Sequence, residues 1–219
     1  MKVLVAGATG QTGQRIVQQL VAKNIATIAL VRDLEKGKSL LPEAAELVVG
    51  DVLQPETLDS AIADATVIIC ATGASPSFDP TGPYKVDYEG TKNLIDAAKA
   101  KSIQHFVMVS SLCTSQFFHP LNLFWLVLYW KKKAEEYLQA SGLTYTIVRP
   151  GGLKNEDNDN AVVMASADTL SEGNIPRSKV AQTCIESLFQ LQAKNKIVEI
   201  VAKPEAPEKP WPDLFASVA

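Results

Sequence analysis

The sequence predicts a single α/β domain built on a mostly parallel, doubly wound sheet of seven strands. Short apolar runs rich in Val and Ile recur along the chain, and stretches with helical periodicity separate them. Each run is apolar at successive positions, which is typical of strands that helices cover on both faces. Strands that alternate with helices in this way form a parallel sheet through right-handed crossovers.

The expected elements follow one another along the whole chain. The expected strands are residues 3–7, 27–32, 46–50, 66–73, 105–111, 145–151 and 197–202. The expected helices are residues 12–23, 55–63, 86–101, 122–140 and 177–191. Four prolines within residues 203–212 disfavour regular structure, so a domain of residues 1–202 is expected to precede an extended tail over 203–219.

The composition excludes several classes of function. A net charge of -3 argues against general electrostatic binding to nucleic acid. Three widely spaced cysteines, Cys70, Cys113 and Cys184, fit a reducing compartment better than a disulfide framework. The two histidines form no cluster with the spacing of a metal site. The first strand begins close to Met1, so no targeting segment is expected, and we expect a cytoplasmic or stromal-type protein.

A glycine-rich turn joins the first expected strand to the first expected helix. Gly7 permits a tight turn, Gly10 lets the backbone approach a pyrophosphate, and Gly13 allows the helix to pack closely on the strand. The helix N-terminus supplies N–H donors and a positive dipole end for phosphate. This context predicts a Rossmann-type domain that binds a dinucleotide at Gly7, Thr9, Gly10, Gln11, Thr12 and Gly13.

The end of the second expected strand bears on the choice of cofactor. An acidic residue there would bind the ribose 2′-hydroxyl of NAD(H), whereas an arginine accommodates the 2′-phosphate of NADP(H). Arg32 precedes Asp33, which favours NADP(H) over NAD(H), and Lys36 adds a second cation. Asp33 keeps NAD(H) open as an alternative.

Residues 117–130 are more apolar than a surface helix should be, yet they are too few to span a bilayer. One interpretation is a helix packed in the core or at a subunit interface. The alternatives are the hydrophobic lip of a substrate pocket and a segment that docks on a protein or membrane surface next to Lys131, Lys132 and Lys133. The oligomeric state stays open for the same reason.

Several motifs together resemble one large family. They are GATGQTGQ, LVRD, GDV, CATGA, VDYEGTKNLIDAA, FVMVSS, WKKKAEEYLQASGLTYTIVRPGGL and DTLSEGNIPRSKVA. The chain resembles the atypical short-chain dehydrogenase/reductase superfamily, and within it the NAD(P)H-binding group of photosynthetic organisms that includes the Tic62-type chloroplast proteins. The resemblance covers essentially the whole chain, and it is much less specific about substrate than about fold.

The resemblance implies a set of cofactor contacts. It puts Asp51 and Val52 beside the adenine, Ala71, Thr72 and Gly73 along the ribose, and Ser110 and the segment Arg149, Pro150, Gly151 and Gly152 toward the nicotinamide. Ligands in such sheets bind at the carboxyl ends of the strands, so these positions are chemically reasonable. The expected substrate side comprises residues 112–130 and 151–177, the second of which is a small C-terminal segment.

The resemblance also implies a serine, a tyrosine and a lysine for carbonyl reduction. Ser110 or Ser111 would polarise the carbonyl, and Tyr129, four residues before Lys133, has the spacing of a proton donor. When the following AEEYL segment is aligned with the family, however, the lysine falls at Lys131 and the tyrosine at Val127. We therefore expect Lys131, with Lys133 as the second choice, to hold the ribose, and Tyr129 stays open as the acid.

These residues lead to two main hypotheses. The first is an NADP(H)-dependent oxidoreductase that acts on a hydrophobic or ring-containing small molecule. The second is an NADP(H)-binding redox sensor or assembly protein with little or no turnover. A third is a reductase of pigments or quinones that relies on the acidity of its substrate and needs no tyrosine.

Overall fold

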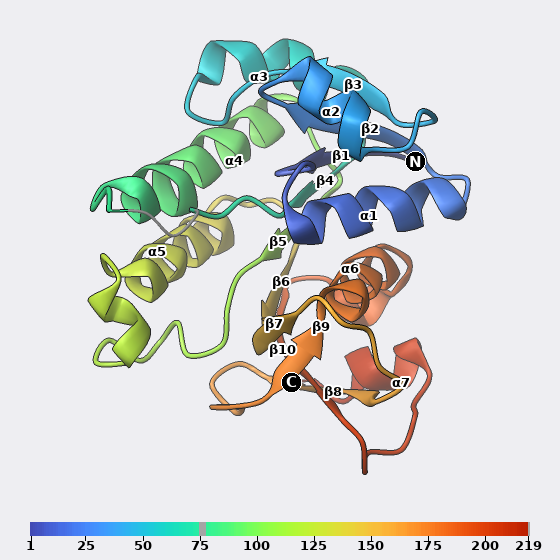
Figure 1. Cartoon of the computed structure of the whole chain (residues 1–219), viewed down its shortest axis with the longest axis vertical. Coiled ribbons are helices and arrows are strands. Elements are labelled where there is room, and N and C mark those ends of the chain that lie inside the picture. The colour runs from blue at the N-terminus through green and yellow to red at the C-terminus, as the bar shows by residue number, and fades with distance from the viewer. Residues whose placement is uncertain (75–77, 219) are drawn as a thin grey trace.

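The computed structural model, which describes residues 1–74 and 78–218, contains an eight-stranded sheet with helices on both faces (Figure 1). The strand order is β3-β2-β1-β4-β5-β6-β10-β8. The strands are β1 (Lys2–Ala6), β2 (Ala26–Val31), β3 (Glu46–Val49), β4 (Val67–Cys70), β5 (His105–Val109), β6 (Tyr145–Pro150), β8 (Ala161–Ser166) and β10 (Lys196–Lys203). This order confirms the doubly wound Rossmann-type fold, with its switch point between β1 and β4.

All seven predicted strands are present and pair in parallel. The predicted number was nevertheless too low, because β8 joins the sheet at its edge, antiparallel to β10. Its sequence, AVVMAS, contains an apolar run that the prediction did not count as a strand, and only Ala161 and Met164 of this run are buried. A separate small sheet pairs β7 (Gly152–Lys154) with β9 (Asn174–Pro176) on the expected substrate side.

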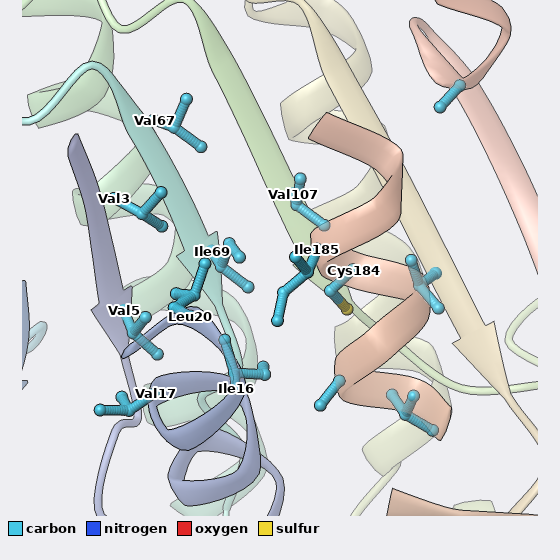
Figure 2. Close-up of a cluster of buried hydrophobic side chains, with 14 of the residues drawn as sticks. Val3, Val5, Ile16, Val17, Leu20, Val67, Ile69, Val107, Cys184 and Ile185 are labelled. Carbon is cyan, nitrogen blue, oxygen red and sulfur yellow. The ribbon is translucent and has the colours of Figure 1, made fainter. Parts of the chain in front are cut away.

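The helices cover the sheet in two layers. They are α1 (Gln11–Ala22), α2 (Leu34–Leu40), α3 (Pro55–Ile62), α4 (Thr91–Ala100), α5 (Val127–Ala140), α6 (Arg177–Glu186) and α7 (Trp211–Ala216), with the shorter η1 (Pro83–Gly90), η2 (Pro120–Leu123), η3 (Ser187–Phe189) and η4 (Leu191–Ala193). Successive side chains of β1 point alternately toward the two helical layers. Val3 and Val5 face α1 and α6, as Figure 2 shows, whereas Leu4 and Ala6 face α3, α4 and α5.

Several predicted helices have different boundaries. The helix expected over 86–101 begins as the π-helix η1 and continues as α4, and the one expected over 177–191 gives way to η3 and η4 after Glu186. The helix expected from Asn122 begins only at Val127, because η2 ends at Leu123 and both Trp125 and Leu126 have positive φ values. No helix in the described part of the chain is long and apolar enough to cross a membrane.

The tail expected to be extended over 203–219 contains the helix α7. Pro212 occupies the first turn of α7, where a missing N–H costs nothing. Leu214 and Phe215 are buried against the core, so burial of apolar surface holds the end of the tail on the domain. The segment between β10 and α7 remains outside regular structure, as its prolines suggested.

Candidate functional site

The glycine loop between β1 and α1 has the geometry of a phosphate cradle. Gly7 has a φ of 76°, and a Cβ there would lie 2.6 Å from the carbonyl oxygen of Ala71. A Cβ on Gly13 would lie 2.1 Å from the carbonyl oxygen of Gly7, so only glycine lets α1 start this close to the loop. Gly10 caps α1 in an extended conformation without a side-chain acceptor, which leaves the first N–H groups of α1 to a ligand.

A cleft of about 460 Å³ opens over this loop at the carboxyl ends of β1 to β4. Its lining consists of Gly7, Thr9, Gly10, Leu30, Arg32, Lys36, Gly50, Asp51, Val52, Leu53, Ala71, Thr72, Gly73, Ala74, Gly82 and Val86. Its volume lies within the usual range for small-molecule and cofactor sites. Asp51 and Val52, expected beside the adenine, and the segment 71–73, expected along the ribose, line it, and so does Arg32.

Other expected cofactor residues lie outside this lining. Gln11, Thr12 and Gly13 form the first turn of α1, directly below the cradle. Ser110, Lys131, Arg149, Pro150, Gly151 and Gly152 come from the ends of β5 and β6 and from α5, beyond the walls of the cleft.

The two acidic residues near the expected adenosine end accept hydrogen bonds from backbone N–H groups. The carboxylate of Asp33 accepts a hydrogen bond from the N–H of Lys36 at 3.0 Å and caps α2. The carboxylate of Asp51 accepts the N–H of Leu53 at 2.9 Å. Arg32, directly after β2, and Lys36, on α2, are the two cations of the lining.

Lys131 lies beside Gly73, which lines the cleft. Its ammonium is 2.7 Å from Oδ1 of Asp87 on η1, and a Cβ built on Gly73 would lie 3.9 Å from that ammonium. Asp87 is only 2% exposed and also accepts the N–H of Ala74 at 3.2 Å. Burial acts to lower the pKa of Lys131, but the Asp87 carboxylate outweighs it and the pKa is raised, so the lysine stays charged.

Tyr129 and Lys133 contact each other but do not line the cleft. The ammonium of Lys133 lies 5.7 Å from the centre of the Tyr129 ring and 2.8 Å from the carboxylate of Glu136. The Tyr129 ring packs against Phe117 and Trp130, with ring centres 5.9 and 5.0 Å away. Because each residue turns a helix by about 100°, this face points away from the face of Lys131.

The two serines after β5 have different surroundings. Ser110 is buried, and its hydroxyl donates to Oε1 of Glu135 at 2.5 Å. Ser111 is half-buried. Cys113 follows with a left-handed φ of 63°, and burial raises the pKa of its thiol. Of the two serines, therefore, Ser111 has the more accessible side chain.

Arg149 was expected beside the nicotinamide, but its guanidinium is fully buried in a network of carboxylates. Nε and Nη2 donate to the two oxygens of Glu135 at 3.0 and 2.7 Å. Nη1 donates to Asp168 at 2.9 Å and to Glu199 at 3.2 Å. Glu199 also accepts the backbone N–H groups of residues 168–170. Arg149 therefore ties α5, β10 and the loop before β9 together, and does not reach the surface of the cleft.

Sequence reasoning did not single out Asp87, Glu135 or Glu199. Glu199 carried a recognisable signal, since it interrupts the apolar run of β10 and a charge in such a strand requires a partner. Asp87 and Glu135 lie on helices where acidic residues are ordinary, so neither stood out from its neighbours.

Comparison with known proteins gives consistent matches. The family profile described as NAD(P)H-binding matches residues 7–190. An uncharacterized chloroplastic protein of Arabidopsis thaliana is 47% identical over 99% of this chain and 82% of its own length. Sanguinarine reductase of Eschscholzia californica is 31% identical over 100% of this chain and 96% of its own length.

A further relative is much longer than this chain. The chloroplastic TIC 62 protein of Pisum sativum is 39% identical over 99% of this chain, which spans only 46% of that protein. Among solved structures, a putative NAD-dependent epimerase/dehydratase from Bacillus halodurans is 28% identical, with a TM-score of 0.87 and 99% of each chain covered.

The glycine cradle, the cleft at the switch point and these matches agree with one another. The fold is that of the NAD(P)-binding Rossmann proteins, and the cradle fits a pyridine nucleotide. The chain belongs to the NAD(P)H-binding family of oxidoreductases, within the atypical short-chain dehydrogenases/reductases.

Proposed function

We propose that the protein is an NADP(H)-dependent reductase of a hydrophobic, ring-containing small molecule. The observation that carries the cofactor preference is the use of Asp33 as the cap of α2. A carboxylate that accepts the N–H of Lys36 is oriented toward the start of α2, and it is a poorer acceptor for a ribose hydroxyl. Arg32 and Lys36 then offer two cations to a 2′-phosphate, and an arginine can bind phosphate through two parallel hydrogen bonds.

Lys131 is the residue that we assign to the ribose on the nicotinamide side. One N–H group of the Lys131 ammonium points to the carboxylate of Asp87, and the other two N–H groups remain to donate to ribose hydroxyls. The charge is maintained because the Asp87 carboxylate raises the pKa of Lys131. Bound NADPH supplies the hydride.

In this proposal the proton that accompanies the hydride does not come from a tyrosine. Val127 occupies the position of the family tyrosine, and Tyr129 lies on another face of α5. The hydroxyl of Ser110 already donates to Glu135, so Ser111 or water is the proton source that fits the site. A substrate that accepts hydride readily, such as a quinone or a conjugated ring system, suits a site without a tuned phenol.

The substrate class and the reaction are supported by one relative. The relative named sanguinarine reductase, which matches this chain over nearly all of both sequences, supports reduction as the reaction. The names of several relatives include the chloroplast, which supports a stromal-type location.

A second candidate is an NADP(H)-binding assembly or regulatory protein without turnover. The absence of a tyrosine at position 127 favours it, because the proton donor typical of the family is then missing. The relatives named TIC 62 and Photosystem II assembly factor Ycf39 of Cyanophora paradoxa, the latter 33% identical over 92% of this chain, support the same candidate.

NADPH consumption distinguishes the two candidates. Quinones, flavins, tetrapyrroles and aldehydes would be offered to the wild-type protein and to Lys131→Met, with Lys133→Met as the matched control on the same helix. The reductase proposal predicts turnover of at least one ring-containing acceptor, strongly reduced in Lys131→Met and kept in Lys133→Met. Tight NADPH binding without turnover of any acceptor would instead favour the assembly protein.

A further inference from the structure

The loop between β5 and α5 exposes an unusual amount of apolar surface. Phe118 is 96% exposed, Leu123 84% and Phe124 67%. Four further apolar side chains of this loop are 37 to 52% exposed, namely Phe117, Leu121, Trp125 and Leu126. Residues 117–126, called here the apolar loop, thus concentrate on one segment the kind of surface that soluble proteins usually cover with a partner. The expectation that this segment packs into the core is wrong for these residues.

The apolar loop has a defined shape. The buried side chain of Asn122 donates to the carbonyl oxygen of Phe117 at 2.8 Å and accepts the N–H groups of Leu128 and Tyr129 at 2.9 and 3.2 Å. One amide thereby closes the loop and satisfies the first turn of α5. Trp125 and Leu126 both adopt left-handed backbone conformations, which are unfavourable for these residue types. The fold therefore maintains a strained loop that displays apolar side chains.

We propose that the apolar loop docks on the surface of an anionic lipid membrane. Its most exposed side chains project outward, and neither of the two cavities described, of about 460 and 200 Å³, is lined by residues 117–126. Apolar side chains that project outward can be buried either in a deformable apolar phase or against a partner surface of complementary shape. The acyl boundary of a bilayer accepts them without a preformed pocket.

A line of aromatic rings leads from the tip of the loop to its base. Phe118 contacts Phe117, Phe117 contacts Tyr129, and Tyr129 contacts Trp130, with ring centres 5.4, 5.9 and 5.0 Å apart. The ring of Tyr84 on η1 follows, 4.8 Å from Trp130. The pure hydrocarbon rings thus lie at the tip and the rings with polar atoms at the base. This is the order in which phenylalanine, tyrosine and tryptophan distribute across a membrane interface.

The charges around the loop suit an anionic surface. Residues 97–134 contain no Asp or Glu, and the loop is followed by Lys131, Lys132 and Lys133. The side chains of Lys132 and Lys133 are 27% and 41% exposed, and the ammonium of Lys132 lies 3.9 Å from the buried carboxylate of Glu135. Lys133 pairs with the exposed Glu136, but such a surface pair is weak and lipid phosphates can compete for the lysine. Lys131 is committed to Asp87 and is not part of this docking surface.

Vesicle co-sedimentation tests the proposal. The full chain would be mixed with vesicles of phosphatidylcholine and phosphatidylglycerol, and separately with vesicles of phosphatidylcholine alone. We expect binding to the mixed vesicles and much weaker binding to the neutral ones. Phe118→Ser combined with Leu123→Ser should reduce binding at least about tenfold, because both side chains lose their apolar transfer energy. The matched control is Leu191→Ser, since Leu191 is 75% exposed on η4, away from the loop.

Two lysine substitutions test the electrostatic contribution to membrane binding. Lys132→Gln and Lys133→Gln should each weaken binding to the mixed vesicles about fivefold and leave binding to neutral vesicles nearly unchanged. All of these side chains are at least partly exposed, and unchanged thermal unfolding would show that the variants are folded.

Three results would overturn the proposal. Wild-type protein that sediments with neither kind of vesicle has no membrane affinity. Binding that survives the Phe118→Ser/Leu123→Ser change uses another surface. A dimer in solution that the same double substitution dissociates would identify a second copy of this chain as the occupant of the loop.

Discussion

The ammonium of Lys131 lies 2.7 Å from the carboxylate of Asp87, beneath Gly73 at the wall of the cofactor cleft. The two residues come from α5 and η1, which the sequence separates by more than forty positions. Their pairing fixes the lysine at the cleft, keeps it charged, and holds the N–H of Ala74. One buried ion pair therefore links the backbone of the cleft to the side chain that we assign to the ribose.

Removing the lysine should separate its role in stability from its role in binding. Lys131→Met leaves the buried Asp87 carboxylate unpaired, so we expect a loss of roughly 3 kcal/mol in the free energy of unfolding. We also expect NADPH affinity to fall at least about tenfold, because a hydrogen bond from a charged donor is lost. Denaturant unfolding and calorimetric titration measure the two effects.

The double variant Asp87→Asn/Lys131→Met provides the control. It removes the unpaired charge, so it should regain most of the lost stability, while NADPH binding should stay weak. A Lys131→Met protein that binds NADPH as tightly as wild type would contradict the assignment of Lys131.

Tyr129→Phe should leave reductase turnover within about twofold of wild type. The phenol packs among Phe117 and Trp130 and does not line the cleft, so the substitution removes no group from the proposed chemistry. Steady-state NADPH oxidation with the best acceptor checks this. A hundredfold fall, about 2.7 kcal/mol of barrier, would return Tyr129 to the role of proton donor.

The buried His105 should make the stability of the fold depend on pH. Burial, and then the positive charge of Lys194, lower the pKa of His105 from 6.5 to about 4. Between these values the unfolded chain binds a proton that the folded chain does not, so stability falls as the pH decreases from about 6.5 to about 4. The pKa difference corresponds to a loss of up to about 3 kcal/mol.

The variant His105→Gln tests whether His105 causes the loss of stability between about pH 6.5 and about pH 4. The hydroxyl of Thr146 donates to the carbonyl oxygen of Ala193 and receives a hydrogen bond from the ring of His105, and a glutamine amide can replace that donor. Unfolding in denaturant at several pH values should show a shallower decline for the variant between pH 6.5 and 4. Parallel curves for the two proteins would exclude His105 as the source.

The sequence predicted the fold well for a physical reason. Strands buried on both faces need continuous apolar runs, and the glycine loop needs glycine at fixed positions, so both leave local signals. β8 also has an apolar run, AVVMA, but the prediction did not count it, and the structure places it at the sheet edge, antiparallel to β10 and only partly buried. α7 was missed because prolines dominate its surroundings, although a helix tolerates proline in its first turn.

The candidate site was predictable only in part. Arg32, Asp51 and Gly73 follow strand ends and therefore converge on the cleft. Asp87 and Glu199 act through partners that are distant in the sequence, and a single sequence does not show such pairings. The spacing of Tyr129 and Lys133 did not by itself show which lysine faces the cleft. Lys131 and Lys133 are two residues apart and therefore point in different directions on the helix, and it is Lys131 that has the buried partner.

The most direct test of the account is the affinity of wild type and Arg32→Ala for NADPH and NADH, measured by calorimetric titration. The account predicts that wild type prefers NADPH and that Arg32→Ala loses NADPH affinity at least about tenfold while NADH affinity changes little, because a hydrogen-bonded ion pair to the 2′-phosphate is removed. Lys36→Ala should show a smaller loss in the same direction. Equal losses for both nucleotides, or a wild type that prefers NADH, would contradict the account.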